Sequence, residues 1–429
     1  MHTSTIRRCS TLAATLAAVT LTAALAGCGT DGDSNDSSNT TNAAGTEPAA
    51  PMSATPVGEQ LRWALHHLAP GAQPPTTDEI NEHISAEFLR DLLPTETVID
   101  LFRETVAERG GVEFERFAFD PRPETAVAII RTGTGDQAAL FLEVEPQPPH
   151  RIEAIAVDDA PAEPMATSGP HSGLFDVNGR QLFLSCVGNG EPTVVVVGGL
   201  TSDWIDVQRP VATTTRVCSY DKPNVLGSRS EHAPTPRHAA GMADELAALL
   251  DAAAVPAPYV VVGHSNGGMV AQLFAATHPD KIAGIVLVDS AHEDQDLRAA
   301  ELARGQLPPE KAEALIAGMT AMPPRLVDPE QFDHTLSRDQ LRASRTTSPL
   351  PTVPMAVLVH GLPLQEVPPP LAELYEPIWQ QMQRDVAALV PGASYHVIAN
   401  TTHDIHGDRP DVVANTIIEV AAASRDQQD

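Results

Sequence analysis

The chain has 429 residues, of which 42% are hydrophobic and 19% charged, and its formal net charge is −29. This length and composition predict a folded protein with two domains. The negative charge argues against binding to nucleic acid and against electrostatic docking on anionic lipid, because both partners are themselves negatively charged.

The N-terminus carries a predicted export signal. Arg7 and Arg8 precede an uncharged stretch at 11–27 that is rich in Ala, Leu and Thr. A positive start, a short apolar segment and small residues at its end are typical of a secretion signal rather than a spanning helix. The stretch ends in Leu-Ala-Gly-Cys at Cys28, which resembles the lipobox of bacterial lipoproteins.

This resemblance implies that residues 1–27 are removed and that Cys28 receives lipid. The protein would then be exported and anchored on the outer face of the bacterial cell membrane. The alternative is an ordinary signal peptide with an incidental cysteine, and the Sec and twin-arginine export routes both stay open. Residues 28–56 are dense in Ser, Thr, Asn, Asp, Gly and Ala, which predicts a disordered tether.

A small α+β domain is predicted at 57–160. The predicted helices are 57–68, 77–92 and 95–109, and the predicted strands are 111–119, 125–131, 138–144 and 151–157. Helices first and antiparallel strands after them favour this class. The segment is similar to the cystatin or ketosteroid-isomerase-type domains of some actinobacterial lipoproteins, which suggests a scaffold, spacer or ligand-sensing role. Residues 161–172, with three prolines, form the predicted linker.

The third segment begins at residue 173. Asn178-Gly179 predicts a tight hairpin turn between two strands. A run of valines at 194–197 reads as a buried strand, and an amphipathic helix is predicted around 242–250.

The sequence Gly263-His264-Ser265-Asn266-Gly267 follows the apolar run at 259–262. A strand that runs through Gly-x-Ser-x-Gly into a helix is the nucleophile elbow of serine hydrolases. The turn is so tight that a Cβ at the glycine positions on either side of the serine would clash with the strand or with the start of the helix, so these positions need glycine. Ser265 is therefore the predicted nucleophile.

With these motifs, residues 173–425 resemble a bacterial α/β-hydrolase of the lipase/esterase-like group. The resemblance implies a mostly parallel, eight-stranded sheet with a cap insertion at about 292–352. Epoxide hydrolases and haloalkane dehalogenases share the fold but use an Asp nucleophile, so Ser265 argues against both.

The resemblance also implies the partners of Ser265, in the chain order serine, acid, histidine. His403, after the last predicted strand, is the expected base, with His406 as second choice. The strand at 355–361 has no carboxylate at the usual place for the acid, so we expect Asp289, at the end of the preceding strand, with Glu366 as the alternative. Asp289 could instead only cap a turn.

Two further features follow from the resemblance. The oxyanion hole is expected to use the backbone N–H groups of Asn266 and Leu200. Relatives usually have His-Gly before the second donor, whereas this chain has Gly-Gly. Cys186 and Cys218 fall on neighbouring strands of this fold, and export to an oxidising compartment favours a disulfide between them. The alternative is two buried free thiols.

The predicted function is hydrolysis of esters or related acyl compounds through an acyl-enzyme. The alternatives are a peptidase or amidase acting on envelope material, and a catalytically inactive envelope-binding lipoprotein. The expected partner is a small acyl substrate, with no nucleic acid. No cofactor is implied, and the spacing of His403, His406 and Asp408 matches no familiar metal site. The sequence leaves the oligomeric state open.

Overall fold

The computed structural model describes residues 55–158, 165–200, 203–225, 227–322, 328–364 and 371–427. The predicted signal segment, Cys28 and most of the tether lie outside these residues. The described chain forms two compact units, 55–158 and 165–427, and each is described by itself. In the described residues, no helix is both long and apolar enough to cross a lipid bilayer.

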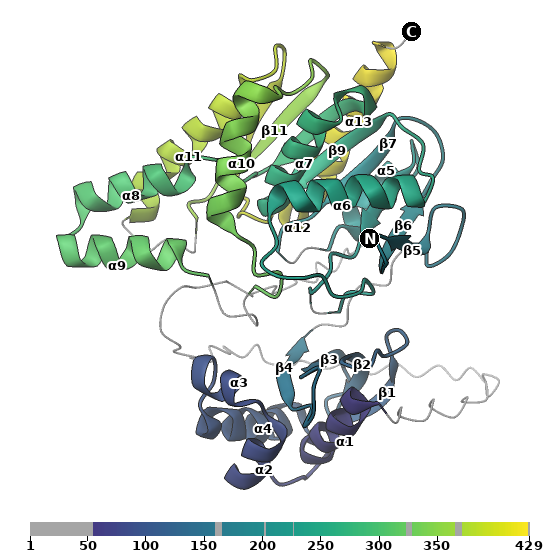
Figure 1. Cartoon of the computed structure of the whole chain (residues 1–429), viewed down its shortest axis with the longest axis vertical. Coiled ribbons are helices and arrows are strands. Elements are labelled where there is room, and N and C mark those ends of the chain that lie inside the picture. Colours follow the sequence, from purple (N-terminus) through teal and green to yellow (C-terminus); the bar gives the residue numbers. More distant parts are fainter. Residues whose placement is uncertain are drawn as a thin grey trace, which may run out of the picture. The chain divides into compact units, whose positions relative to one another are not determined.

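The N-terminal unit consists of helices followed by an antiparallel sheet, as the α+β prediction requires (Figure 1). Its elements are α1 (Pro56–Leu68), α2 (Thr77–His83), α3 (Ala86–Asp91), α4 (Thr95–Arg109), β1 (Val112–Phe117), β2 (Thr125–Thr132), β3 (Gln137–Val144) and β4 (Ile152–Asp158). The strands are ordered β1-β2-β3-β4, and helix α1 packs on β2 and β3. Residues 126–130 of β2 and 138–142 of β3 are all buried, so burial along these two strands is continuous rather than alternating.

The prediction of one helix at 77–92 was wrong, because two residues interrupt it. Ile84 is extended and forms a bridge with Ile152 at the start of β4. Ser85 then begins a new helix, since its side chain accepts a hydrogen bond from the backbone N–H of Phe88 at 3.1 Å. Strand pairing and a local cap therefore outweigh helical propensity at this point.

The C-terminal unit is built on an eight-stranded sheet with the order β12-β11-β10-β9-β7-β8-β6-β5. The strands are β5 (Gly173–Val177), β6 (Arg180–Val187), β7 (Thr193–Val197), β8 (Val217–Tyr220), β9 (Tyr259–His264), β10 (Ile282–Val288), β11 (Met355–His360) and β12 (Ser394–Ile398). The pairings from β12 to β8 are parallel, and β6 and β5 pair antiparallel. The mostly parallel, eight-stranded sheet is thus confirmed.

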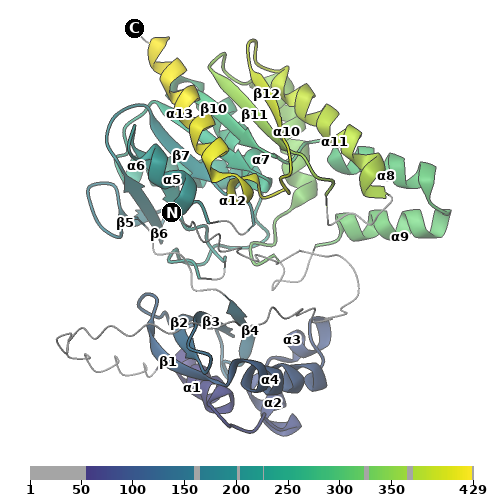
Figure 2. The same cartoon turned by 180° about the vertical axis from the view of Figure 1, so that it is seen from behind.

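Helices cover both faces of this sheet (Figure 2). The helices of the unit are α5 (Ile205–Val211), α6 (Ala239–Ala252), α7 (Asn266–Thr277), the short 3-10 helix η1 (Pro279–Lys281), α8 (Gln295–Gln306), α9 (Pro309–Thr320), α10 (His334–Thr347), α11 (Leu371–Ala387), α12 (Ile405–Asp408) and α13 (Pro410–Asp426). Helices α6, α7 and α11 bury one face, and α5 and α13 bury the other. The central strands are therefore apolar on both faces, which explains their continuous valine-rich runs.

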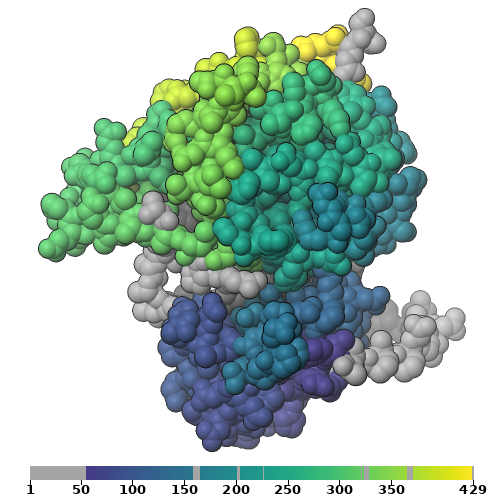
Figure 3. Space-filling view, viewed as in Figure 1, coloured from purple at the N-terminus to yellow at the C-terminus, as the bar shows by residue number. Residues whose placement is uncertain are grey.

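Helices α8, α9 and α10 form the insertion between β10 and β11 that the sequence predicted as a cap. In the space-filling view, the green surface of α8 and α9 projects from the side of the C-terminal unit (Figure 3).

The first strands of this unit carry the predicted turn and a disulfide. Asn178 and Gly179 join β5 to β6 and have φ values of 54° and 82°, as a two-residue hairpin turn requires. Cys186 on β6 lies directly opposite Cys218 on β8, and the two form a disulfide. Of the two predicted thiol states, the structure shows the disulfide.

Candidate active site

Ser265 lies at the tip of β9, where the chain turns into α7. Its φ of 52° and ψ of −127° are rare for a residue with a side chain, so the backbone is held there by its surroundings. A Cβ at Gly267 would collide with the backbone oxygens of Val197 and Gly198. Only glycine therefore lets the start of α7 pack against the end of β7, as the sequence predicted.

The loop after β7 reaches the same turn. A Cβ at Gly199 would lie 2.8 Å from Nδ1 of His264 and 3.0 Å from Cβ of Ser265. The absence of a side chain at Gly199 thus permits direct contact between this loop and the elbow. Both predicted oxyanion donors lie at this junction, since Leu200 follows Gly199 and Asn266 follows Ser265.

Asp289 follows β10, next to the end of β9. Val288 pairs with His264 in the parallel ladder, so the next residues along the two strands, Asp289 and Ser265, lie at neighbouring strand ends. Asp289 is fully buried and has a φ of 45°, a second strained backbone position at this edge. Strand order and register thus place a buried carboxylate beside the elbow.

His403 and Asp289 are 114 residues apart in the chain and meet directly. Nδ1–H of His403 donates a hydrogen bond to Oδ2 of Asp289 at 2.5 Å. A carboxylate only accepts hydrogen bonds, so this contact places the proton on Nδ1 and leaves Nε2 as the basic nitrogen. The His403 side chain is 26% exposed, which leaves the imidazole accessible.

Asp289 receives three more N–H groups. Nδ1 of His360, the last residue of β11, donates to Oδ2 at 2.6 Å, and its backbone N–H donates to Oδ1 at 3.3 Å. Nε1 of Trp379 on α11 donates to Oδ1 at 2.9 Å. Burial opposes the charge on Asp289, but the hydrogen bonds from His360 and His403 outweigh it and hold the pKa of this carboxyl well below its usual range.

His360 also contacts a second carboxylate. Its Nε2 donates to Oε2 of Glu376 at 2.9 Å, and the imidazole is fully buried. Burial would favour the neutral ring, yet the hydrogen bonds to Asp289 and Glu376 prevail and raise the pKa of His360 to about 10. His360, Glu376 and Trp379 were missed from the sequence. The available signal was His360 itself, the only titratable residue in the strand Met355–His360.

His264, His406 and Trp204 form a neutral group on the elbow. Nε2–H of His264 donates to the backbone oxygen of His403 at 3.0 Å, and the ring of His406 stacks on Trp204 at 4.4 Å between centroids. Burial, with His403 and His406 nearby, drives the pKa of His264 well below its usual value, and burial lowers that of His406 to about 4. The structure therefore joins His403, and not His406, to the buried carboxylate.

Glu366, the alternative acid, lies outside the described residues. Among those described, Asp289 is the carboxylate in contact with His403.

Two sets of described residues have ligand-type atoms within 4.8 Å of one another, as a bound metal would need. These sets are Asp289, His360 and His403, and His264, Asp404 and His406. In the first set, both imidazoles already donate to Asp289 at 2.5 and 2.6 Å. These two contacts have the geometry of hydrogen bonds between imidazole nitrogens and a carboxylate.

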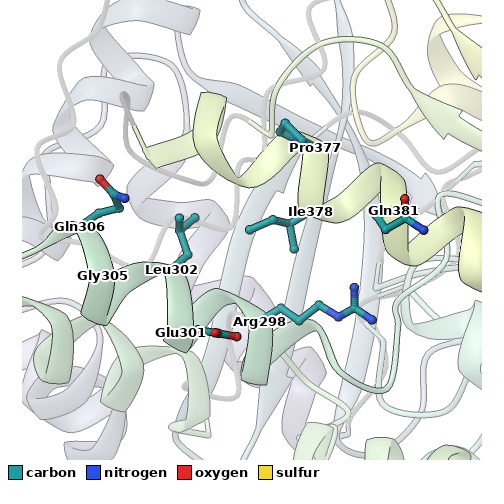
Figure 4. Close-up of a pocket in the computed structure, with 8 residues that line it drawn as sticks. All are labelled: Arg298, Glu301, Leu302, Gly305, Gln306, Pro377, Ile378 and Gln381. Carbon is teal, nitrogen blue, oxygen red and sulfur yellow. The ribbon is translucent and has the colours of Figure 1, made fainter.

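A groove of about 570 Å³ lies between α8 and α11 in the cap region. Figure 4 shows Leu302 of α8 and Ile378 of α11 on its two sides, with Arg298 and Gln381 nearby. At about 100° per residue, Pro377 and Gln381, which also line the groove, lie about 160° around α11 from Trp379. Helix α11 therefore separates this groove from Asp289.

Residues 192–344 match the sequence family described as the alpha/beta hydrolase fold. The C-terminal unit has the α/β-hydrolase fold. The match spans β7 to α10 and so includes Ser265 and Asp289 but ends before His403.

Curated relatives match shorter parts of the chain. Lipase LipV of Mycobacterium tuberculosis is 37% identical over 100 residues, which are 21% of this chain and 38% of the lipase. The Pimeloyl-(acyl-carrier protein) methyl ester esterase of Chromobacterium violaceum is 35% identical over 107 residues, 25% of this chain and 40% of that esterase.

The Probable transporter efuK of Hormonema carpetanum is 32% identical over 139 residues, 30% of this chain. The chain spans only 20% of that protein's length, and its match to the lipase and the esterase is also well short of their full length. The likeness therefore concerns a part of each protein and not its whole length.

Proposed function

We propose that the protein is a serine hydrolase that cleaves esters or related acyl compounds through an acyl-enzyme on Ser265. The observation that carries the proposal is the 2.5 Å hydrogen bond between His403 and the buried Asp289, formed at the strand edge where the nucleophile elbow lies. The names of the matched lipase and methyl ester esterase support ester hydrolysis.

In the proposed reaction, Nε2 of His403 removes the proton of Ser265 as its Oγ attacks the acyl carbon. Asp289 holds the imidazole in the required tautomer and stabilises the imidazolium that forms. The backbone N–H groups of Asn266 and Leu200 stabilise the oxyanion. His403 then protonates the leaving alcohol, and water activated by the same histidine releases the acid and restores Ser265.

A fluorophosphonate probe tests the nucleophile. It should label the purified wild type, and Ser265→Ala should abolish labelling because it removes the hydroxyl that His403 is proposed to activate. Ser394→Ala, at an exposed position on β12, is the matched control and should label normally. Labelling that persists in Ser265→Ala would refute the assignment.

The substrate class is tested with p-nitrophenyl esters of graded acyl length. We expect turnover of these esters and a lower rate for the matching p-nitroanilides, since an amide has the poorer leaving group. Faster cleavage of the anilides would favour a peptidase or amidase instead.

We further propose that the protein is an exported lipoprotein anchored at Cys28 on the outer face of the bacterial cell membrane. The support is the lipobox-like sequence that ends at Cys28 and the apolar stretch before it. In a bacterial host, the wild type should incorporate labelled palmitate and fractionate with membranes. Cys28→Ala should lose both properties, and palmitate labelling of that variant would exclude Cys28 as the lipidated residue.

A further inference from the structure

We propose, building on the function proposed for Ser265 and His403, that His360 is a positively charged positioning residue. Held between Asp289 and Glu376, it fixes the orientation of the catalytic acid and sets the net charge that acts on His403. Nothing in the sequence pattern of the elbow assigns a role to His360 or Glu376.

The charge follows from counting protons. Both ring nitrogens of His360 face carboxylate oxygens, Nδ1 to Asp289 at 2.6 Å and Nε2 to Glu376 at 2.9 Å. A neutral imidazole carries one N–H and could donate to only one of these groups. Two charge-assisted hydrogen bonds to two carboxylates require the imidazolium. The raised pKa of His360 agrees with this count.

The position of Asp289 follows from its donors. Oδ2 is shared by His360 and His403, and Oδ1 receives Nε1–H of Trp379 at 2.9 Å. These donors come from β11, α11 and the loop after β12, so the carboxylate is held from three directions. A buried acid fixed in this way presents one oxygen to His403 in a constant geometry.

Glu376 restores the charge that His360 removes. Asp289 and His360 together are neutral, and a neutral pair would stabilise the His403 imidazolium less than a lone carboxylate does. Addition of Glu376 returns the group to a net charge of −1. Glu376 is itself held on α11, since Oε1 accepts a hydrogen bond from Gln380 at 2.9 Å.

Other titratable groups face this cluster from neighbouring elements. They are His403 after β12, Tyr375 on α11, and Tyr395 on β12, whose ring lies under Arg384. Burial raises the pKa of both tyrosines, so they keep their protons at neutral pH. Within this cluster, the charge that acts on His403 near neutral pH is therefore set by Asp289, His360 and Glu376.

The test is the pH dependence of fluorophosphonate labelling between about pH 5 and 10, measured on the full mature chain. The acid limb of this profile reports deprotonation of the base. His360→Gln leaves two negative charges, so its acid limb should move to higher pH. Glu376→Gln leaves none, so its limb should move to lower pH. Each shift should be roughly half a pH unit or more, about threefold in rate on that limb.

The double variant His360→Gln/Glu376→Gln returns the net charge to −1, and its acid limb should return towards the wild-type position. His396→Gln on β12 and Glu373→Gln on α11 are exposed, matched controls that should keep the wild-type profile. A uniform loss of rate with unmoved profiles would show that His360 is merely structural. Shifts of both single variants in the same direction would also overturn the proposal.

A second measurement does not depend on activity. The side-chain ¹⁵N signals of His360, assigned by their loss in His360→Gln, should be those of an imidazolium at pH 8. Signals of a neutral ring would overturn the proposal even if the fluorophosphonate probe does not react with the protein. An imidazolium in a protein that does not react with the probe would refute only the proposed function. If His360→Gln fails to fold, Glu376→Gln still tests the direction of the pH shift. The His360 signals are then assigned as those that move in the ¹⁵N spectrum of Glu376→Gln.

Discussion

His403 contacts two buried clusters whose histidines differ in charge. On one side is the Asp289 cluster, which we define as Asp289, His360, Glu376 and Trp379. On the other is the Trp204 cluster, Trp204, His264 and His406, whose His264 ring lies 4.8 Å from that of His403 between centroids. Burial is nearly complete for the histidines in both groups, so burial alone does not decide their charge.

The groups that contact each imidazole decide its charge. In the Asp289 cluster, carboxylates accept from both nitrogens of His360 and favour the charged ring. In the Trp204 cluster, the imidazoles contact a backbone oxygen, an indole face and another imidazole, and the exposed Asp404 carboxylate lies 3.8 Å from Nε2 of His264, beyond hydrogen-bond distance. Nδ1 of both His264 and His406 is buried with no hydrogen-bond partner among the described residues. The reacting histidine is therefore supported by negative charge on one side and held in place by neutral rings on the other.

The two groups also affect stability in opposite ways. The pKa of His360 is raised from 6.5 to about 10. Its contribution to the free energy of unfolding is therefore complete below pH 6.5 and is lost as the pH rises through 10. The pKa of His406 is lowered from 6.5 to about 4, so its contribution is complete above pH 6.5 and is lost as the pH falls through 4. Between them, the two residues favour greatest stability near pH 6.5.

The largest expected effect comes from breaking the charged group. Asp289→Asn removes the negative charge and replaces one acceptor oxygen by an NH₂ group, so the side chain can no longer accept at both positions, from His360 and His403 at one and from Trp379 at the other. We expect kcat for an ester substrate to fall by roughly 10³- to 10⁴-fold, because His403 loses its tautomer and its counter-charge. Asp411→Asn, at an exposed position on α13, should keep normal activity. Near-normal turnover of Asp289→Asn would identify a different acid.

A smaller effect is expected from the neutral side. His264→Phe removes the hydrogen bond to the backbone of His403, so the loop that carries the base should be less well positioned. We expect a loss of roughly 10- to 100-fold in kcat with little change in KM. His264→Gln can still donate and should recover much of the rate. Equal losses in the two variants would show that ring packing, and not the hydrogen bond, matters.

The third prediction concerns stability rather than rate. His406→Phe keeps a flat ring on Trp204 but has no nitrogen that could bind a proton. The wild type should lose on the order of 3 kcal/mol of unfolding free energy between pH 6.5 and 4 because of His406, and the variant should not. Denaturant unfolding of both proteins at pH 7 and pH 4.5 measures the difference. Parallel losses would mean that His406 titrates normally in the fold.

The smallest effect on catalysis is expected for the disulfide, which lies on β6 and β8, away from both groups. The cysteines are 32 residues apart, so their replacement by serine should lower the unfolding free energy by about 3–4 kcal/mol through loop-closure entropy. The pH profile of labelling should stay that of the wild type. A shifted profile would show that strands β6 and β8 are coupled to the site.

Much of the site could be predicted because its parts are local patterns. The elbow around Ser265 is a run of five residues after a valine-rich strand, and Asp289 ends the next such strand. His403 was expected from its place after the last strand, and the structure brings it to Asp289. The prediction of one helix at 77–92 was wrong because Ile84 pairs with a strand about 70 residues away, and local propensity does not reveal such a pairing.

By itself, the sequence determined the buried strands, the turn that carries Ser265 and the chain order of the proposed catalytic residues. These depend on side-chain periodicity and on backbone conformations that neighbouring residues set. Only the tertiary structure decided that His360 stands between Asp289 and Glu376, and that His264 and His406 do not share its charge. The charge of a buried imidazole depends on which acceptors the fold brings to its nitrogens, and those acceptors come from distant strands and helices.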